Sequence, residues 1–480
     1  GGLREGAGIE AAAAAVRIRG ARVGAQAGVE MVGEGALSQE LGAEVELLAH
    51  HALRGGVLAK ALRYLRQAGE KAVARSANRE AVGFFEQALA LLNGMPQTAE
   101  NLSEALDIRI ALGPALIGLK GATAPEVENV YLRAQELVDR LEDPARRFQI
   151  LWNLWFVKFT RGDYSNAMSA AELLLQTAER GGDAGQILEA HHSFWPMLSA
   201  MGQAKSAVRH MERGLKLYVQ EQHASQAFVY GGHDAGACCR WHLAMNRWLL
   251  GFPEKASGDL KDALRLADEL QHPQTSGLAL SFASWIQYQL GEHERAAEIT
   301  EQLAELAEAH GFGPLLDYAM VLRRVLGDRQ DVTALEPEEL RALRLSQWRR
   351  AFCACTVAER YAREGSADQG LAVLASLTDE ERTTFYAPEV LRIEGDLILR
   401  SAAPDRGEAE RLFRGAIDLA RKREEKSFEL RAAISLARFW QQEGRHKEAH
   451  GILASIYGWF TEGFDTADLR AAKALLDELA

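Results

Sequence analysis

The stretch that decides the fold is EAERLFRGAIDLARKREEKSFELRAAISLARFWQQEGRHKEAHGILASIY, residues 408–457. Ala409, Phe413 and Ala416 follow one another at steps of four and three residues, which places them on one face of an α-helix. A similar pattern of small and larger apolar residues begins again 40 residues later, at Ala449. Between the two lies another apolar helical pattern, which ends in the turn sequence GRH. The stretch therefore predicts helices that pack in pairs and are joined by tight turns.

Such triads recur along the chain. From Val127 onward their first residues are separated by 40, 40, 49, 40, 74, 39 and 40 residues, and the step of 74 leaves room for a degenerate unit around Gly327 and Leu340. A helix pair with one apolar face cannot bury that face alone, so the pairs must stack on one another. We predict an all-α fold, an α-solenoid of about ten stacked helix-turn-helix units with an inner groove as its binding surface. The triads are Ala81/Phe85/Ala88, Val127/Tyr131/Ala134, Ala167/Ala171/Leu174, Ala207/Met211/Gly214, Ala256/Leu260/Ala263, Ala296/Thr300/Leu303, Gly370/Leu374/Leu377, Ala409/Phe413/Ala416 and Ala449/Leu453/Ile456.

The composition argues against several classes of protein. The 480 residues include 55 Lys and Arg against 67 Asp and Glu, a net charge of −12, so no overall positive charge attracts the chain to nucleic acid or to an anionic membrane. No apolar run reaches the ~18 residues that a membrane-spanning helix needs. The four cysteines match neither a disulfide framework nor a CxxC zinc site, which favours a reducing compartment, and we expect a cytoplasmic protein.

Three regions are expected along the chain. Residues 1–38 are rich in Gly and Ala with few large apolar side chains, and we expect this lead-in to be disordered. Residues 39–465 form the predicted solenoid, and residues 466–480 form a helix that covers its open end. Thr123, before Pro125, and Asp465 are the predicted N-terminal caps of two helices.

One irregularity in the spacing suggests a binding element. The step from Ala207 to Ala256 exceeds its neighbours by nine residues, and the excess lies near HASQAFVYGGHDAG, where two glycines must break a helix. An insertion in a solenoid is often its working surface. Tyr230, His233, Asp234 and Arg240 are therefore the candidate residues for binding a partner or ligand. The alternative is a structural kink in which polar side chains cap the next helix.

Other chemistry finds less support in the sequence. Asp234, Cys238 and His242 share one helical face and could in principle ligate zinc, but no fourth ligand is evident. We therefore expect Cys238 to be a buried packing residue with Asp234 as a helix cap, and no metal or other cofactor. No nucleophile–base arrangement stands out, so no catalytic residue is predicted. The aromatic residues Trp152, Trp155, Phe156 and Phe159, here called the stripe, have helical spacing. We expect the stripe in the core.

The triads resemble the tetratricopeptide repeat, most clearly at Ala409/Phe413/Ala416 and at Gly69/Ala81/Phe85/Ala88. More specific strings are LLAHHALRGGVLAKALRYLRQAGEKAVARSANREA from Leu47, YGGHDAGACCR from Tyr230, and KSFELRAAISLARFWQQEGRHKEAHGILASIYGWFTEGFDTADLRAAKALLDEL from Lys426. Together they resemble the C-terminal tetratricopeptide region of bacterial signalling proteins in which a class III adenylate/guanylate cyclase domain precedes an AAA-type ATPase domain.

The resemblance implies a non-catalytic sensor or scaffold that binds a protein or small ligand in its groove and regulates cyclase and ATPase domains of the same protein. The sequence itself holds no G-x-x-x-x-G-K-[ST] phosphate loop, so it carries no ATPase residues of its own. The alternative is the repeat domain of a transcription regulator of the maltose-activator type. That class carries a basic helix-turn-helix, often at its C-terminus, whereas this chain ends in the acidic sequence LRAAKALLDELA.

Overall fold

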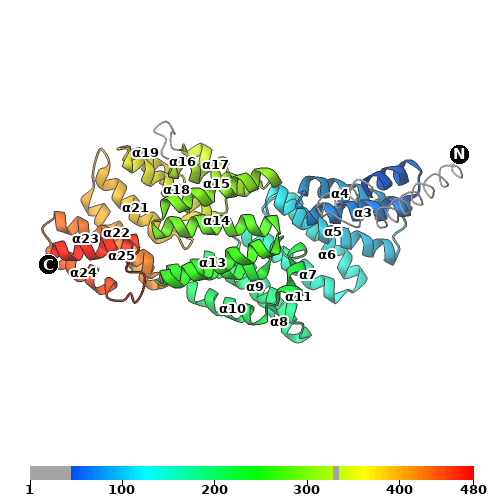
Figure 1. Ribbon diagram of the computed structural model, residues 1–480, viewed down its shortest axis with the longest axis horizontal. Helices are drawn as coiled ribbons and strands as arrows, with labels where there is room; N and C mark the ends of the chain where they lie inside the picture. Colours follow the sequence, from blue (N-terminus) through cyan, green and yellow to red (C-terminus); the bar gives the residue numbers. More distant parts are fainter. Residues whose placement is uncertain (1–44, 328–334) are drawn as a thin grey trace, which may run out of the picture.

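The computed structural model describes residues 45–327 and 335–480. These residues form helices and connecting turns and contain no β-strand, which confirms the predicted all-α solenoid (Figure 1). Residues 45–54 are also helical. The predicted lead-in, residues 1–38, lies outside the described residues. No helix in the described ranges is long and apolar enough to span a bilayer.

Within these ranges, nine helix-turn-helix units can be assigned, each made of two consecutive helices that pack against each other. A tenth unit, around Gly327 and Leu340, is represented by α16 (Gly313–Leu326) and the short α17 (Pro337–Ala342). The pairs are α3 (Leu58–Ala74) with α4 (Asn78–Asn93), α5 (Ala99–Lys120) with α6 (Pro125–Leu141), α7 (Pro144–Thr160) with α8 (Tyr164–Gly181), α9 (Ala184–Ala200) with α10 (Ala204–Leu217), α12 (Ala235–Leu249) with α13 (Pro253–Leu270), α14 (Pro273–Leu290) with α15 (His293–His310), α18 (Gln347–Arg363) with α19 (Ala367–Ala375), α21 (Ala387–Arg400) with α22 (Arg406–Arg423), and α23 (Lys426–Gln442) with α24 (His446–Tyr457). Shorter elements are α11 (Gln220–His223), the 3₁₀ helix η1 (Ala224–Phe228) and α20 (Asp379–Arg382), and α25 (Ala467–Leu479) packs on α23 and α24.

The predicted triads are the contact face of the second helix in each pair, and every member is buried. Gly69 on α3 shows why small residues face the triads, because a Cβ atom at this position would lie 2.5 Å from the ring of Phe85 on α4. Helix axes can approach this closely only where one side chain is missing. The repeat spacing is therefore a packing requirement.

Two predicted helix caps are wrong. Proline favours an extended conformation in the residue before it, so Ala124, not Thr123, is the N-cap of α6, and it makes no side-chain cap. Thr466 has the extended backbone of an N-cap residue and α25 begins after it, so Asp465 lies outside the helix. Both errors shift a helix start by one residue.

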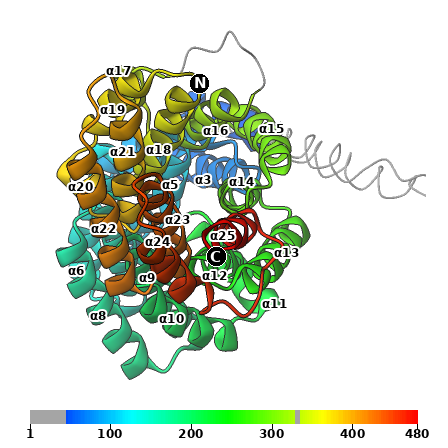
Figure 2. The same cartoon turned by 90° about the vertical axis from the view of Figure 1, so that its left-hand side faces the viewer.

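The solenoid winds so tightly that successive turns touch (Figures 1 and 2). Ser427 Oγ donates to the carbonyl of Trp248, 179 residues away, and the Gly463 N–H donates to Glu254 Oε1, 209 residues away. Near the other end, α5 packs against α16. These contacts join helices that lie far apart in the sequence.

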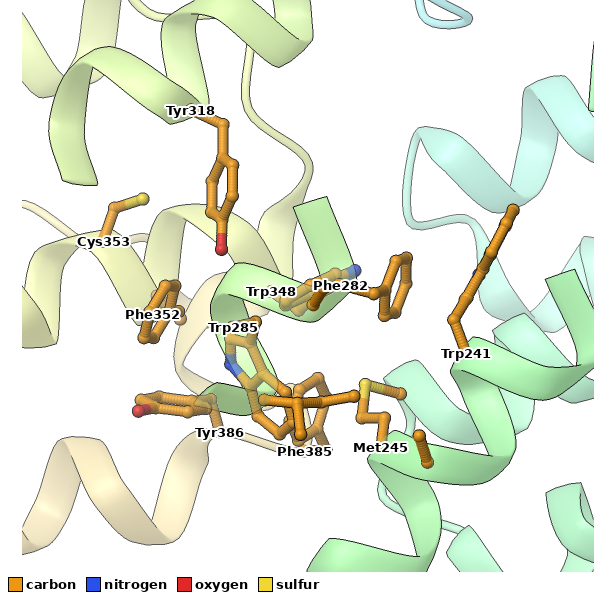
Figure 3. Packing of buried hydrophobic residues seen from close by; sticks show 14 of the residues in the cluster. Trp241, Met245, Phe282, Trp285, Tyr318, Trp348, Phe352, Cys353, Phe385 and Tyr386 are labelled. Atoms are coloured by element: carbon orange, nitrogen blue, oxygen red, sulfur yellow. The ribbon is translucent and has the colours of Figure 1, made fainter. Parts of the chain in front are cut away.

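A large apolar cluster, of which Figure 3 shows a part, extends from α7 to α23. Trp285 is fully buried and makes edge-to-face contacts with Trp348, Phe352 and Phe385. Aromatic pairs of this geometry add to the stabilisation from burial alone. The contacts join α14 to α18 and to the segment before α21.

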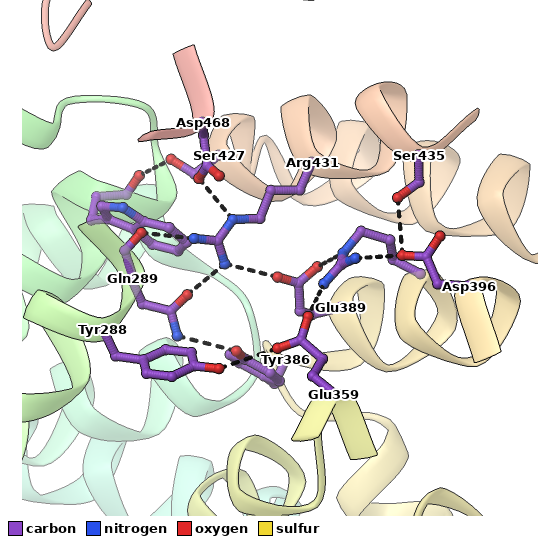
Figure 4. Close-up of polar contacts among 12 residues, drawn as sticks. Tyr288, Gln289, Glu359, Tyr386, Glu389, Asp396, Ser427, Arg431, Ser435 and Asp468 are labelled. Carbon is purple, nitrogen blue, oxygen red and sulfur yellow. Dashed lines mark hydrogen bonds and ion pairs between the residues drawn. The ribbon is translucent and has the colours of Figure 1, made fainter. Parts of the chain in front are cut away.

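A buried polar network joins α14, α21, α23 and α25 (Figure 4). Arg431 donates to Glu389 at 2.8 Å, to Asp468 at 2.7 Å and to the carbonyl of Gln289 at 2.7 Å. Burial acts to raise the pKa of Glu389, but the guanidinium groups of Arg392 and Arg431 prevail and lower it. The carboxylate is therefore held ionised between two arginines.

Candidate functional site

A cavity of about 380 Å³ lies inside the superhelix. We call it the central cavity. Its walls come from α5, α7, α9, α12, α14 and the residues 312–315 and 343–350, which are far apart in the sequence and meet because the solenoid turns on itself. The volume falls within the range of roughly 300–1,000 Å³ that is usual for small-molecule sites.

Aromatic side chains make up much of the wall. Trp155, Phe156 and Phe159 reach it from α7, and Phe282 and Trp348 reach it from α14 and α18. Trp155 and Phe159 stack with ring planes 1° apart. The prediction that the stripe belongs to the core holds for Trp152 and Trp155, which are fully buried, whereas Phe156 and Phe159 are half-buried on the cavity wall.

The wall carries positive charge without carboxylates, because its lining residues include four Lys or Arg and no Asp or Glu. Three of these cations have partners elsewhere: Lys120 pairs with Glu126, Arg344 with Asp317, and Arg350 with Glu381. Arg349 differs, since no ion pair joins it to a carboxylate anywhere in the described ranges.

Arg349 is held in place by aromatic rings. Its guanidinium carbon lies 4.8 Å from the ring centre of Trp348, 5.3 Å from that of Phe282 and 5.4 Å from that of Tyr318. Nη2 donates to Ser281 Oγ at 2.8 Å. Burial lowers the pKa of Arg349. Cation–π contacts of this kind orient a guanidinium but leave its charge uncompensated.

Several polar groups of the lining residues have no hydrogen-bond partner within the described part of the chain. They include the indole N–H groups of Trp155 and Trp241, the hydroxyl of Ser346 and Nε of Arg349. Buried polar groups normally have a hydrogen-bond partner, and a ligand, water or ion in the cavity can supply one here. Most of these groups are hydrogen-bond donors.

The structure places the candidates of the inserted segment next to this cavity, although not as an exposed loop. Tyr230 is 4% exposed and packs edge-on against Phe148 and Trp152. Asp234 is 1% exposed, caps α12 by accepting from the Ala237 N–H at 2.8 Å, and also accepts from a tyrosine hydroxyl. Both side chains therefore make structural contacts.

Of the other two candidates, only His233 lines the central cavity. Arg240 donates to the Gly236 carbonyl on its own helix and lies over the ring of Tyr218. The inserted residues themselves form α11 and η1. Gly231 and Gly232 break the helix with φ of +67° and +76°, as the sequence predicts.

Gly231 also positions His233. A Cβ atom at Gly231 would lie 2.9 Å from the Trp152 ring and 3.2 Å from the His233 ring. The positive φ and this close approach leave room for glycine alone. His233 thereby reaches α9, where its Nε2 lies 3.2 Å from that of His192.

Asp234 caps α12, Cys238 and His242 lie within this helix, and all three are buried. The Nδ1 atom of His242 lies 2.9 Å from the Cys238 carbonyl oxygen and 3.5 Å from its sulfur. All four cysteines are buried and free. Sequence reasoning missed His192, because His233, which it contacts, lies 41 residues away in the sequence. It also missed Arg349, which resembles any other arginine in the sequence.

No protein-family model matches the chain. The chain is 27% identical over 267 residues to an uncharacterised protein of Rhizobium meliloti (strain 1021), and the match covers 55% of this chain and 26% of that protein. The matched region thus spans about a quarter of the length of this curated relative.

Among solved structures, a Rap protein complexed with competence and sporulation factor has a TM-score of 0.44 at 13% identity, covering 87% of this chain and 99% of that one. A STAND protein with a tetratricopeptide repeat sensor from Pyrococcus horikoshii has a TM-score of 0.35 at 11% identity, covering 87% of this chain and 55% of that one. Yeast Tom70 has a TM-score of 0.34 at 12% identity, with coverages of 92% and 96%. At TM-scores below 0.5, function has to be inferred from the residues of this chain.

Proposed function

We propose that this chain is a non-catalytic sensor region that binds a ligand in the central cavity. The ligand is a peptide or small molecule that joins an apolar body to one anionic group. The observation that carries the proposal is Arg349, a cation on the wall of a cavity whose lining residues include no Asp or Glu.

The cavity offers contacts for both the apolar body and the anionic group of such a ligand. Phe156, Phe159 and Phe282 offer apolar contact area. Arg349 offers a planar group of hydrogen-bond donors for a carboxylate or phosphate. Hydrogen bonds between charged groups are stronger than hydrogen bonds between neutral groups. A bound anion would also compensate a charge that otherwise lacks a carboxylate partner.

Ligand binding can regulate attached domains because the walls come from successive turns of the superhelix. A ligand that contacts α7, α14 and α18 together stabilises the arrangement in which these helices are close. It then shifts the population toward that arrangement by its difference in affinity for the two states. We propose that this shift regulates cyclase and ATPase domains of the parent protein.

The binding test uses 1-anilinonaphthalene-8-sulfonate, an aromatic anion whose fluorescence reports an apolar site. We predict saturable binding of one molecule per chain, weakened about tenfold or more in Arg349→Met, because a hydrogen bond to a charged group contributes roughly 1.5–3 kcal/mol. The matched control is Arg363→Met, which removes an exposed arginine from the same helix. Equal affinities of the two variants, at equal melting temperatures, would refute the role of Arg349.

The regulatory half of the proposal has a separate test. The coding sequence upstream of Gly1 is expected to encode a cyclase domain and an ATPase phosphate loop. A basic helix-turn-helix domain in the parent protein, in place of these, would favour the transcription regulator instead.

A further inference from the structure

Three buried side chains place possible metal-ligand atoms close together on the wall of the central cavity. They are His192 on α9, His233 just before α12, and Cys238 in the first turn of α12, and their ligand atoms lie within 4.8 Å of one another. All three residues line the central cavity, which provides a path for an ion to enter.

The remaining ring nitrogens of the two histidines are held as they are in metal sites. His192 Nδ1 lies 2.8 Å from Glu189 Oε2, and His233 Nδ1 lies 3.2 Å from the carbonyl oxygen of Gly231. A carbonyl oxygen only accepts, so Nδ1 of His233 carries the ring proton and its Nε2 presents a lone pair. An ionised Glu189 fixes the same tautomer at His192. Carboxylate and carbonyl partners of this kind orient metal-binding histidines.

The two Nε2 atoms then face each other with their lone pairs at 3.2 Å. Two lone pairs at this distance repel each other unless a proton or a metal ion lies between the atoms. Two nitrogens about 2.0–2.1 Å from a zinc ion, at the tetrahedral angle, are separated by about 3.4 Å. The spacing of His192 and His233 therefore suits one shared metal ion.

The surroundings of Glu189, beside His192, also favour a cation at this point. Glu189 is 1% exposed, and its one ion pair in the described ranges is with His192. A buried carboxyl group without a Lys or Arg partner is costly when it is ionised. A divalent cation bound to His192 supplies the positive charge that the site lacks.

We propose that His192 Nε2, His233 Nε2 and Cys238 Sγ bind one Zn²⁺ ion whose fourth coordination position faces the central cavity. Imidazole and thiolate ligands together suit zinc. On binding, the Cys238 thiol releases its proton to solvent, and the charges of Zn²⁺, the thiolate and the Glu189 carboxylate sum to zero. Trp195 Nε1 donates to Cys238 Sγ at 3.5 Å and stabilises the thiolate.

The test compares two adjacent cysteines. Cys238 and Cys239 are each 1% exposed, but the Cys239 thiol points away and donates to the Met211 carbonyl at 3.3 Å. The purified chain is stripped with a chelator and titrated with Zn²⁺ and with Co²⁺. We expect one ion per chain, a zinc-dependent rise in melting temperature, and thiolate-to-cobalt charge-transfer absorption. Cys239→Ala should retain all three properties, and Cys238→Ala should lose the absorption band and about a hundredfold in zinc affinity.

His233→Gln provides a second variant, which should weaken zinc binding while keeping the thiol. Less than a tenth of a zinc ion bound per chain in the unsubstituted protein would contradict the proposal. In that case a protonated Glu189 donates a hydrogen bond to His192, and a hydrogen bond joins His192 to His233. Equal zinc affinity in the two cysteine variants would reveal an adventitious ion only. Binding of the aromatic sulfonate is measured on the metal-free chain, so either proposal can fail alone.

Discussion

His272 shows how one half-buried side chain makes the stability of the fold depend on pH. Thr275 Oγ1 accepts from the Asp234 N–H and lies 2.8 Å from His272 Nδ1, with which it forms a hydrogen bond. Burial lowers the pKa of His272 to about 4. An unfolded chain protonates histidine near pH 6.5, so between about 6.5 and 4 the unfolded state binds a proton that the native state does not. The contribution of His272 to stability is therefore lost as the pH falls through this window.

We predict that His272→Gln reduces the drop in melting temperature between pH 7 and pH 5. Thermal melts across this range check the prediction, with His446→Gln, an exposed histidine, as the control. An unchanged drop in His272→Gln would mean that other groups cause the pH dependence.

The buried triad residues could be predicted, because spacing in the sequence alone decides which residues share one face of a helix. Phe85 and Ala88 lie on one face by their spacing alone, and both are fully buried. The roles of Phe156 and Phe159 could not be predicted in this way. Their spacing is equally helical, but only the curvature of the superhelix decides whether a face meets another helix or the cavity.

The helix pair α3/α4 allows a direct test of the repeat register. Ala88 on α4 is fully buried, and Ala90, two residues later, is exposed. Ala88→Asp places an unpaired charge between helices, and we predict a loss of about 3 kcal/mol or more in unfolding free energy. Ala90→Asp should cost less than about 1 kcal/mol. Urea unfolding compares the two, and similar losses would show that the assigned face is wrong.

Element boundaries and the inserted segment were predicted less well than the pairs themselves. The extra residues before α12 suggested an exposed binding loop, and they form α11 and η1, which bring Tyr230 and His233 inward. Spacing reveals an insertion but not the side to which it folds. His192 could have been considered as a partner only by comparing neighbouring helix pairs.

For the whole molecule, contacts between successive turns stabilise the superhelix. Arg431 is the clearest case, because it bonds to Gln289, 142 residues away, and lies 5.0 Å from the ring centre of Trp248. We predict that Arg431→Met costs about 3–5 kcal/mol, since Gln289, Glu389 and Asp468 each lose a buried partner. Arg438→Met on the same helix removes an exposed arginine and should be nearly neutral. Chemical denaturation of both variants checks the difference, and equal stabilities would contradict the structural role of the network.

The central claim, that the cavity is the ligand site, is tested most directly by hydrogen–deuterium exchange with and without the aromatic sulfonate. Residues 343–346 precede α18, are not helical and line the cavity, so their amides report occupancy. We predict slower exchange there and at the end of α7 around Phe159, with no change in α22 and α24, which contribute no residue to the wall. Protection confined to α22 and α24, or no protection at residues 343–346 at saturating ligand, would contradict the claim.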